Sequence, residues 1–291
     1  MQKILATADL HWHLYPTGDA CTLDLVKYVT NSDADVFIVA GDVADRDTGE
    51  FAECLELFGD FDGHKLVVPG NHDLWTTNDN SREKHRTILP DLARQNGFHY
   101  LDKGPFAREG VGFIGNIGWY DYSFRNTEIG LTLEDYKRKS VPGRCGWNDR
   151  HFVQWELTDE QFTENCLQRL RRHYSQIEND ADVVVSVLHH LAFRDLLYPQ
   201  ASYPLEFCRA YLGSERFGQL LLRCPKVKYV ICGHRHGKDS HAENGLKSFV
   251  VGGEYKKKQL LEIDLQKDAH RYIEFAPPDE DEAQESEIPG E

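Results

Sequence analysis

Five short polar segments carry the residues of this chain that could do chemistry. They are Asp9-Leu10-His11, Gly41-Asp42, Gly70-Asn71-His72-Asp73, His189-His190 and Gly233-His234-Arg235-His236. Each segment follows an apolar run of strand-like composition, such as DVFIVA before Gly41. Carboxylate, imidazole and amide donors without cysteine are typical of sites for hard to borderline divalent metals. The pattern therefore predicts a metal site and a metal-dependent hydrolase.

Strand and helix signals alternate in the first third of the chain. The expected elements are strand 2–8, helix 22–30, strand 35–40, helix 49–59 and strand 65–69. This alternation is the βαβ pattern of a largely parallel, buried sheet, and Thr22 is the expected N-cap of the first helix. Ligands of open α/β sheets gather beyond the carboxyl ends of the strands. Asp9, Asp42 and Asn71 are therefore expected to lie close together.

The rest of the chain predicts a second run of elements around one irregular segment. They are helix 80–96, strands 98–101, 106–108 and 111–115, helix 158–175, strand 182–188, helix 204–223 and strands 227–232, 247–252 and 259–264. The capping box Thr158-Asp159-Glu160-Gln161 opens the helix at 158. Residues 116–157 are rich in glycine, aromatic and charged residues and lack periodicity. They are expected to form a functional loop or insert within one domain that spans residues 1–275.

Composition and charge exclude several classes of protein. No run approaches the length of apolar sequence that crosses a membrane, and the N-terminus lacks the features of a signal peptide, so the cytosol is the expected location. Seven irregularly spaced cysteines include no CxxC pair, which argues against a zinc–thiolate site. The net charge of −15 disfavours a general nucleic-acid binder. Residues 276–291 are strongly acidic and nearly free of apolar side chains, and they are expected to be a disordered tail.

The ordered blocks D-x-H, G-D, G-N-H-D, H and G-H-x-H resemble the signature of the calcineurin-like metallophosphoesterases. All five blocks are present, in order, between residues 9 and 236. The resemblance implies an α/β fold, a four-layer α/β/β/α sandwich with two central mixed β-sheets. It also implies a dinuclear centre with one metal on Asp9, His11, Asp42 and His236 and a second metal on Asp42, Asn71, His189 and His234. Asp42 would then bridge the two metals.

Two of these blocks space their donors by two residues. On an extended segment Asp9 and His11 would point the same way, as would His234 and His236. The same alternation would turn Arg235 away from the site, where it is expected at the surface.

The resemblance also implies a mechanism. Two divalent ions would deprotonate a bridging water and clamp the phosphoryl group. His72 resembles the family's acid that protonates the leaving oxygen, and its ordinary pKa suits that role. The segment GDVADR is similar to G-D-x-V-D-R of Ser/Thr protein phosphatases, so Asp45 would orient His72 and Arg46 would grip a phosphate oxygen. Manganese is the expected metal, although iron, zinc, cobalt and nickel suit the same donors.

Several roles stay open at this level. His190 is expected near the metals or in a loop hydrogen bond, and His13 on the substrate side or in a structural contact. The aromatic segment Trp119-Tyr120-Asp121-Tyr122 either lines the substrate cleft or packs the insert against the body, and Trp75 is a candidate wall of the site. The leading hypothesis is hydrolysis of a phosphomonoester or phosphodiester on a small or phosphorylated molecule. A nuclease or cyclic-nucleotide phosphodiesterase and a non-catalytic scaffold of the same fold are the alternatives.

Overall fold

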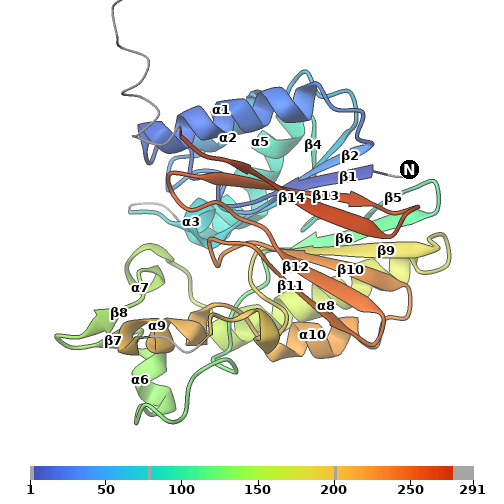
Figure 1. Ribbon diagram of the computed structural model, residues 1–291. Coiled ribbons are helices and arrows are strands. Elements are labelled where there is room, and N and C mark those ends of the chain that lie inside the picture. The colour runs from blue at the N-terminus through green and yellow to red at the C-terminus, as the bar shows by residue number, and fades with distance from the viewer. Residues whose placement is uncertain (1–2, 78–79, 200–201, 278–291) are drawn as a thin grey trace, which may run out of the picture.

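Two six-stranded mixed sheets lie at the centre of the computed structural model, which describes residues 3–77, 80–199 and 202–277 (Figure 1). The first has the strand order β14-β13-β1-β2-β3-β4 and the second β11-β12-β10-β9-β6-β5. The first sheet consists of β1 (Lys3–Thr7), β2 (Val36–Ala40), β3 (His64–Val68), β4 (Phe98–Tyr100), β13 (Lys258–Asp264) and β14 (Ala269–Phe275). The second consists of β5 (Phe106–Arg108), β6 (Val111–Asn116), β9 (Val183–Leu188), β10 (Val227–Cys232), β11 (Asp239–Glu243) and β12 (Leu246–Val250).

The strands of the inner part of each sheet run parallel, as the βαβ pattern predicts. β1 to β4 are parallel to one another, and so are β6, β9, β10 and β12, whereas the remaining strands at the edges are antiparallel. Alternate residues of a strand serve two separate cores. On β2, Ile38 packs with Val185 and Ile231 of the second sheet, whereas Phe37 packs with Leu25 and Phe58 of the helical layer. Burial on both faces explains why these strands read as continuous apolar runs.

Helices cover the outer face of each sheet and complete four layers. In Figure 1, α1 (Pro16–Thr30), α2 (Thr48–Glu56) and α5 (Leu89–Gln95) lie over the first sheet, and α8 (Asp159–Ile177) and α10 (Glu215–Leu221) lie over the second. The predicted four-layer α/β/β/α sandwich with two central mixed sheets is confirmed. The predicted capping box of α8 is present, since Thr158 Oγ1 accepts a hydrogen bond from the Gln161 backbone N–H and the Gln161 side chain accepts one from Thr158. No described helix is long and apolar enough to cross a bilayer.

Two predicted helices have different bounds. The first begins at Pro16, not at residue 22, because proline suits the first turn of a helix, and the Thr22 hydroxyl donates inside the helix to Gly18 O. The predicted helix 204–223 is broken into α9 (Tyr203–Cys208), a 3-10 turn and α10. The break falls at Gly213, whose backbone pairs with Leu191 so closely that a Cβ would lie 2.0 Å from Leu191 O.

The segment 116–157 contains more regular structure than its sequence indicates. It holds α6 (Leu133–Lys137), the hairpin β7 (Ser140–Val141) and β8 (Cys145–Gly146), and α7 (Asp149–Phe152). Together with α9 these elements form a lobe at one end of the sandwich (Figure 1). The edge strands β11 and β14 were not predicted. The division into one domain of residues 1–275 stays a prediction, and most of the predicted tail 276–291 lies outside the described residues.

The remaining short helical elements connect the layers. They are α3 (Asn71–Leu74), α4 (Ser81–Glu83), a π-helical turn (Lys84–Ile88) and two 3-10 turns (Arg194–Leu196 and Arg209–Tyr211). The predicted helix 80–96 is thus continuous in outline, with a π turn before Pro90.

Candidate metal centre

The polar segments singled out in the sequence follow the carboxyl ends of five parallel strands. These strands are β1, β2 and β3 of the first sheet and β9 and β10 of the second, and Asp9, Asp42, Asn71, His189 and His234 come one to three residues after them. The two sheets present these ends on the same side of the sandwich, next to the lobe (Figure 1). The fold therefore brings side chains together that lie more than 200 residues apart in the chain.

Two clusters of possible metal ligands result, and they share one carboxylate. The ligand atoms of each cluster lie within 4.8 Å of one another, the first being Asp9, His11, Asp42 and His236 and the second Asp42, His189 and His234. Within the first, His11 Nε2 and His236 Nε2 are 3.3 Å apart. Asn71 belongs with the second cluster, because its Oδ1 lies 3.2 Å from His189 Nε2. All seven predicted ligands thus lie in one place.

Tight backbone turns, not extended segments, aim these side chains. Asp9, His11, Asp42, His234 and His236 all have positive φ, between 44° and 69°. The expectation that period-two alternation on an extended segment would align Asp9 with His11, and His234 with His236, is therefore wrong. Left-handed backbone is unfavourable for residues with a Cβ, and such strain is concentrated at functional sites.

Two glycines leave room for the carboxylates. A Cβ at Gly70 would lie 2.0 Å from Asp42 Oδ1, and a Cβ at Gly252 would lie 1.9 Å from Asp9 Oδ2. Gly70 belongs to a block that the sequence singled out, whereas Gly252 lies after β12 in a segment without a motif. Both positions fix the carboxylates by close backbone approach.

His189 is oriented by the strand beside it. Its Nδ1 donates a hydrogen bond to Ala40 O at 2.9 Å, which leaves Nε2 to face Asp42 Oδ2 at 3.3 Å and His234 Nδ1 at 3.1 Å. A hydrogen bond that fixes the tautomer and ring orientation in this way is typical of histidines that bind metals.

A buried carboxylate oxygen without a hydrogen-bond partner fits a bound cation. Asp42 Oδ2 is buried and forms no hydrogen bond within the described residues, and Asp42 belongs to both ligand clusters. Burial would raise the pKa of Asp42, but the charges of His189 and His72 hold it well below its usual range. Burial lowers the pKa of His234 well below its usual value, so this imidazole is neutral and can donate an electron pair. The donor set of carboxylate, imidazole and amide groups fits two divalent ions.

His72 lies at the rim of this cluster with the partners that its predicted role requires. Its Nδ1 donates to Asp45 Oδ1 at 2.6 Å, and its ring stacks on Trp75 with centroids 3.7 Å apart. Burial opposes protonation, but the charge of Asp42 and the hydrogen bond to Asp45 outweigh it and raise the pKa of His72. The expected contact between Asp45 and His72 is present.

Comparison with known proteins decides the family. The model of the calcineurin-like phosphoesterase family matches residues 2–238, most of the chain and all five blocks. The chain belongs to the calcineurin-like phosphoesterase family.

Solved structures of similar fold agree with this assignment. A phosphopantetheinyl hydrolase, PptH, from Mycobacterium tuberculosis is 20% identical with a TM-score of 0.69, and the match covers 99% of this chain and 98% of that one. A dimetal phosphatase from Danio rerio is 14% identical with a TM-score of 0.60, covering 94% of this chain and 98% of that one. At these identities the likeness shows the fold. No curated protein sequence matches the chain significantly.

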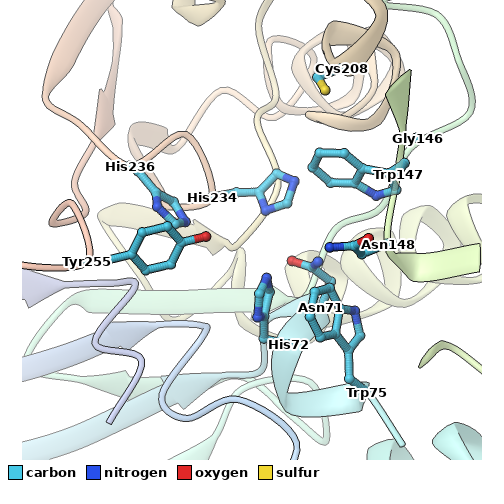
Figure 2. Close-up of a pocket in the computed structure, with 10 residues that line it drawn as sticks. All are labelled: Asn71, His72, Trp75, Gly146, Trp147, Asn148, Cys208, His234, His236 and Tyr255. Atoms are coloured by element: carbon cyan, nitrogen blue, oxygen red, sulfur yellow. The ribbon is translucent and has the colours of Figure 1, made fainter. Parts of the chain in front are cut away.

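A cavity of about 200 Å³ opens above the calcineurin-like site (Figure 2). His234, His236 and Asn71 line it, and Trp75 and Trp147 lie on one side of it (Figure 2). The Tyr255 hydroxyl points toward its centre from beside His236 (Figure 2). Trp75 was expected as a wall of the site, whereas Trp147 and Tyr255 carry no sequence signal beyond their aromatic character.

Asp149, which the sequence did not indicate, accepts hydrogen bonds from four side chains around the site. It is 1% exposed and accepts hydrogen bonds from Asn71 Nδ2 at 3.0 Å, Trp75 Nε1 at 2.6 Å, Tyr120 OH at 2.9 Å and Trp147 Nε1 at 2.7 Å. The bond to Asn71 turns the amide oxygen toward His189. The carboxylate therefore joins the lobe, the cavity wall and a candidate ligand.

The other candidate residues have separate partners. His13 contacts Asp19 and Glu53, which favours its structural role. His190 Nδ1 donates to Ile117 O at 3.0 Å, and its Nε2 is outside both ligand clusters. Arg235 points away from the site as expected, but it is buried, so its expected surface position is wrong.

The aromatic segment Trp119-Tyr120-Asp121-Tyr122 packs the insert against the body of the protein. Trp119, Tyr120 and Tyr122 are at most 1% exposed, and none of them lines the cavity. Trp119 Nε1 donates to Asp159 Oδ1 at 2.9 Å at the start of α8. Of the two alternatives for this segment, the structure supports attachment of the insert to the body.

Proposed function

We propose that this chain is a dinuclear metal-dependent hydrolase of phosphoesters. The observation that carries the proposal is the convergence of seven donors around Asp42, which belongs to both ligand clusters. Asp9, His11 and His236 would hold one ion with Asp42. Asn71, His189 and His234 would hold the second with the same carboxylate. When bound, the ions would supply Lewis acidity and a water acidified to near neutral pKa.

The residues around the metal ligands have complementary tasks. His72 holds a proton next to the position of the leaving oxygen and donates it there, and the Asp45 carboxylate keeps its imidazole in place. Arg46 Nε donates to Asp45 Oδ2 at 3.1 Å, and its guanidinium lies over the Phe152 ring at 3.9 Å. Its role in gripping phosphate stays a prediction, and it would require the guanidinium to leave these contacts, because Arg46 does not line the cavity above the site.

The identity of the metal and the cellular setting belong to the same proposal. Manganese is the proposed ion, with iron, zinc, cobalt or nickel as alternatives that suit the same donors. The proposed partner is a small phosphoester or a phosphorylated molecule, and the proposed compartment is the cytosol. The complete set of donors and His72 argue against a non-catalytic scaffold.

A matched pair of variants tests the proposal. Asp42→Asn removes the negative charge shared by both clusters, and Asp62→Asn removes a negative charge from an exposed loop. A panel of mono-, di-, cyclic and nucleotide esters, with a phosphopantetheinyl diester included, is assayed with manganese and with a chelator. We expect Asp42→Asn to lose at least about 100-fold in kcat/KM, equivalent to about 3 kcal/mol, and Asp62→Asn to match the wild type. Full activity of folded Asp42→Asn would contradict the proposal.

A further inference from the structure

The cavity above the metal centre has walls without a charged lysine or arginine. Its ten lining residues, shown in Figure 2, are asparagine, histidine, tryptophan, glycine, cysteine and tyrosine. The stretches of sequence outside the described ranges contain no lysine or arginine. A cation that completes the wall would therefore have to come from a described part of the chain.

Four described cations near the site have other partners. Arg150 lies beside the cavity residue Gly146, and its Nε donates to His151 Nε2 at 2.8 Å. Arg46 contacts Asp45 and lies over Phe152, outside the lining of the cavity. Arg235 Nη1 donates to Leu196 O at 2.7 Å and to Asp239 Oδ2 at 2.8 Å. Lys258 is buried beneath the ligands, with Nζ donating to Asp9 O at 3.1 Å. Apart from His72, which faces the leaving oxygen, and the two histidines among the candidate metal ligands, the cavity is lined by neutral amide, indole, phenol and thiol side chains and by Gly146.

A phosphomonoester and a phosphodiester place different groups against such a wall. A phosphoryl group that turns two oxygens to the metal centre and its leaving oxygen to His72 has one substituent left. In a monoester this substituent is an oxygen that shares about two negative charges at neutral pH. In a diester it is an ester oxygen with an organic group. A charged oxygen without a cationic partner in a partly desolvated cavity is unfavourable.

We propose that this site acts on phosphodiesters in preference to phosphomonoesters. The inference rests on the proposed function and narrows its substrate class. The aromatic walls fit the second organic group, because Trp147 and Tyr255 line the cavity from opposite sides (Figure 2). Asn148 on the same wall supplies a neutral amide, a hydrogen-bond donor that carries no charge.

Two substrates with the same leaving group test the preference. With manganese at pH 8, we expect kcat/KM for bis(p-nitrophenyl) phosphate to exceed that for p-nitrophenyl phosphate at least about 10-fold. A ratio at or below one would overturn the inference and leave the proposed function standing. Failure to hydrolyse either ester would instead refute the proposed function.

A charge added to the wall tests the physical cause. Asn148 is exposed and its side chain does not cap α7, so Asn148→Lys preserves local structure. Gln176→Lys adds the same charge to the exposed face of α8. We expect Asn148→Lys to lower the diester-to-monoester ratio at least about 10-fold and Gln176→Lys to leave it unchanged. An unchanged ratio in Asn148→Lys, with its fold intact by circular dichroism, would refute the electrostatic cause.

Binding provides a readout that is independent of turnover. Trp75 and Trp147 line the cavity, so ligand binding to metal-loaded His72→Asn is followed by tryptophan fluorescence. We expect methyl phenyl phosphate to bind at least about 10-fold more tightly than phenyl phosphate, and Asn148→Lys in the same background to reduce that difference. Tighter binding of phenyl phosphate to the unmodified wall would contradict the inference.

Discussion

Gly252→Ala places one methyl group against a candidate metal ligand. The new Cβ would lie 1.9 Å from Asp9 Oδ2, and contacts under 3.0 Å are essentially never seen for real Cβ atoms, so the carboxylate or the backbone must move by at least about 1.1 Å. Both Asp9 oxygens accept from the His234 backbone N–H at 3.1 Å, and the side chain is fully buried. The substitution therefore shifts the ligand in a region that has no free space.

The size of that shift sets the expected effect. Metal–ligand distances tolerate only about 0.2 Å, and a misplacement of about 1 Å in a catalytic constellation costs roughly 100-fold in rate. We therefore expect Gly252→Ala to bind metal more weakly at the site of Asp9 and to lose about 100-fold in kcat/KM. Overpacking would also lower the free energy of unfolding by about 1–3 kcal/mol.

The assay separates the lost ligand from lost stability. Equilibrium dialysis measures the manganese stoichiometry, and an aryl phosphoester serves as the substrate for kcat/KM. The free energy of unfolding is measured in urea on the metal-free protein. Gly104→Ala is the control, because no atom lies within 4 Å of its new Cβ and its φ is not left-handed. If Gly252→Ala binds two ions with wild-type affinity and activity, the position of Asp9 does not matter and the reasoning fails.

Three further perturbations test other parts of the site and the fold. His72→Asn should lower kcat about 100-fold for an alkyl ester, whose leaving oxygen needs a proton, and much less for a p-nitrophenyl ester; equal losses would exclude His72 as the acid. Asp149→Ala leaves three buried donors and one half-buried donor without their acceptor, so urea denaturation should show a loss of about 3–5 kcal/mol, and a loss below about 1 kcal/mol would refute its connecting role. Burial, and then the charges of Arg169 and Arg172, lower the pKa of His173 to about 4. Because the unfolded chain alone takes up this proton as the pH falls from about 6.5 to 4, stability should fall by up to about 3 kcal/mol over that range, and His173→Gln should show a shallower slope.

The convergence of the donors could be predicted because it follows from strand direction. Parallel strands end on one side of their sheet, and Asp42 and Asn71 come directly after two such ends. The prediction needs no knowledge of turn geometry. The positive φ of Asp9 and His234 was missed because the residue types alone do not reveal a tight turn, and the assumed extended segment was wrong although the side chains do meet.

Contacts between remote segments could not be predicted. Asp149 is one acid among many in the sequence, and its role depends on donors at residues 71, 75, 120 and 147. Gly252 acts through its proximity to Asp9, which the chain order does not show. The break at Gly213 likewise depends on pairing with Leu191, which overrides a helical pattern that is continuous in sequence.

Anomalous scattering from a crystal grown with manganese tests the central claim most directly. Two ions in contact with protein oxygen and imidazole donors would each give a peak at the manganese absorption edge. We expect one peak among Asp9, His11 and His236 and another among Asn71, His189 and His234, with Asp42 between them. The absence of anomalous peaks at these positions, in protein saturated with manganese, would contradict the account.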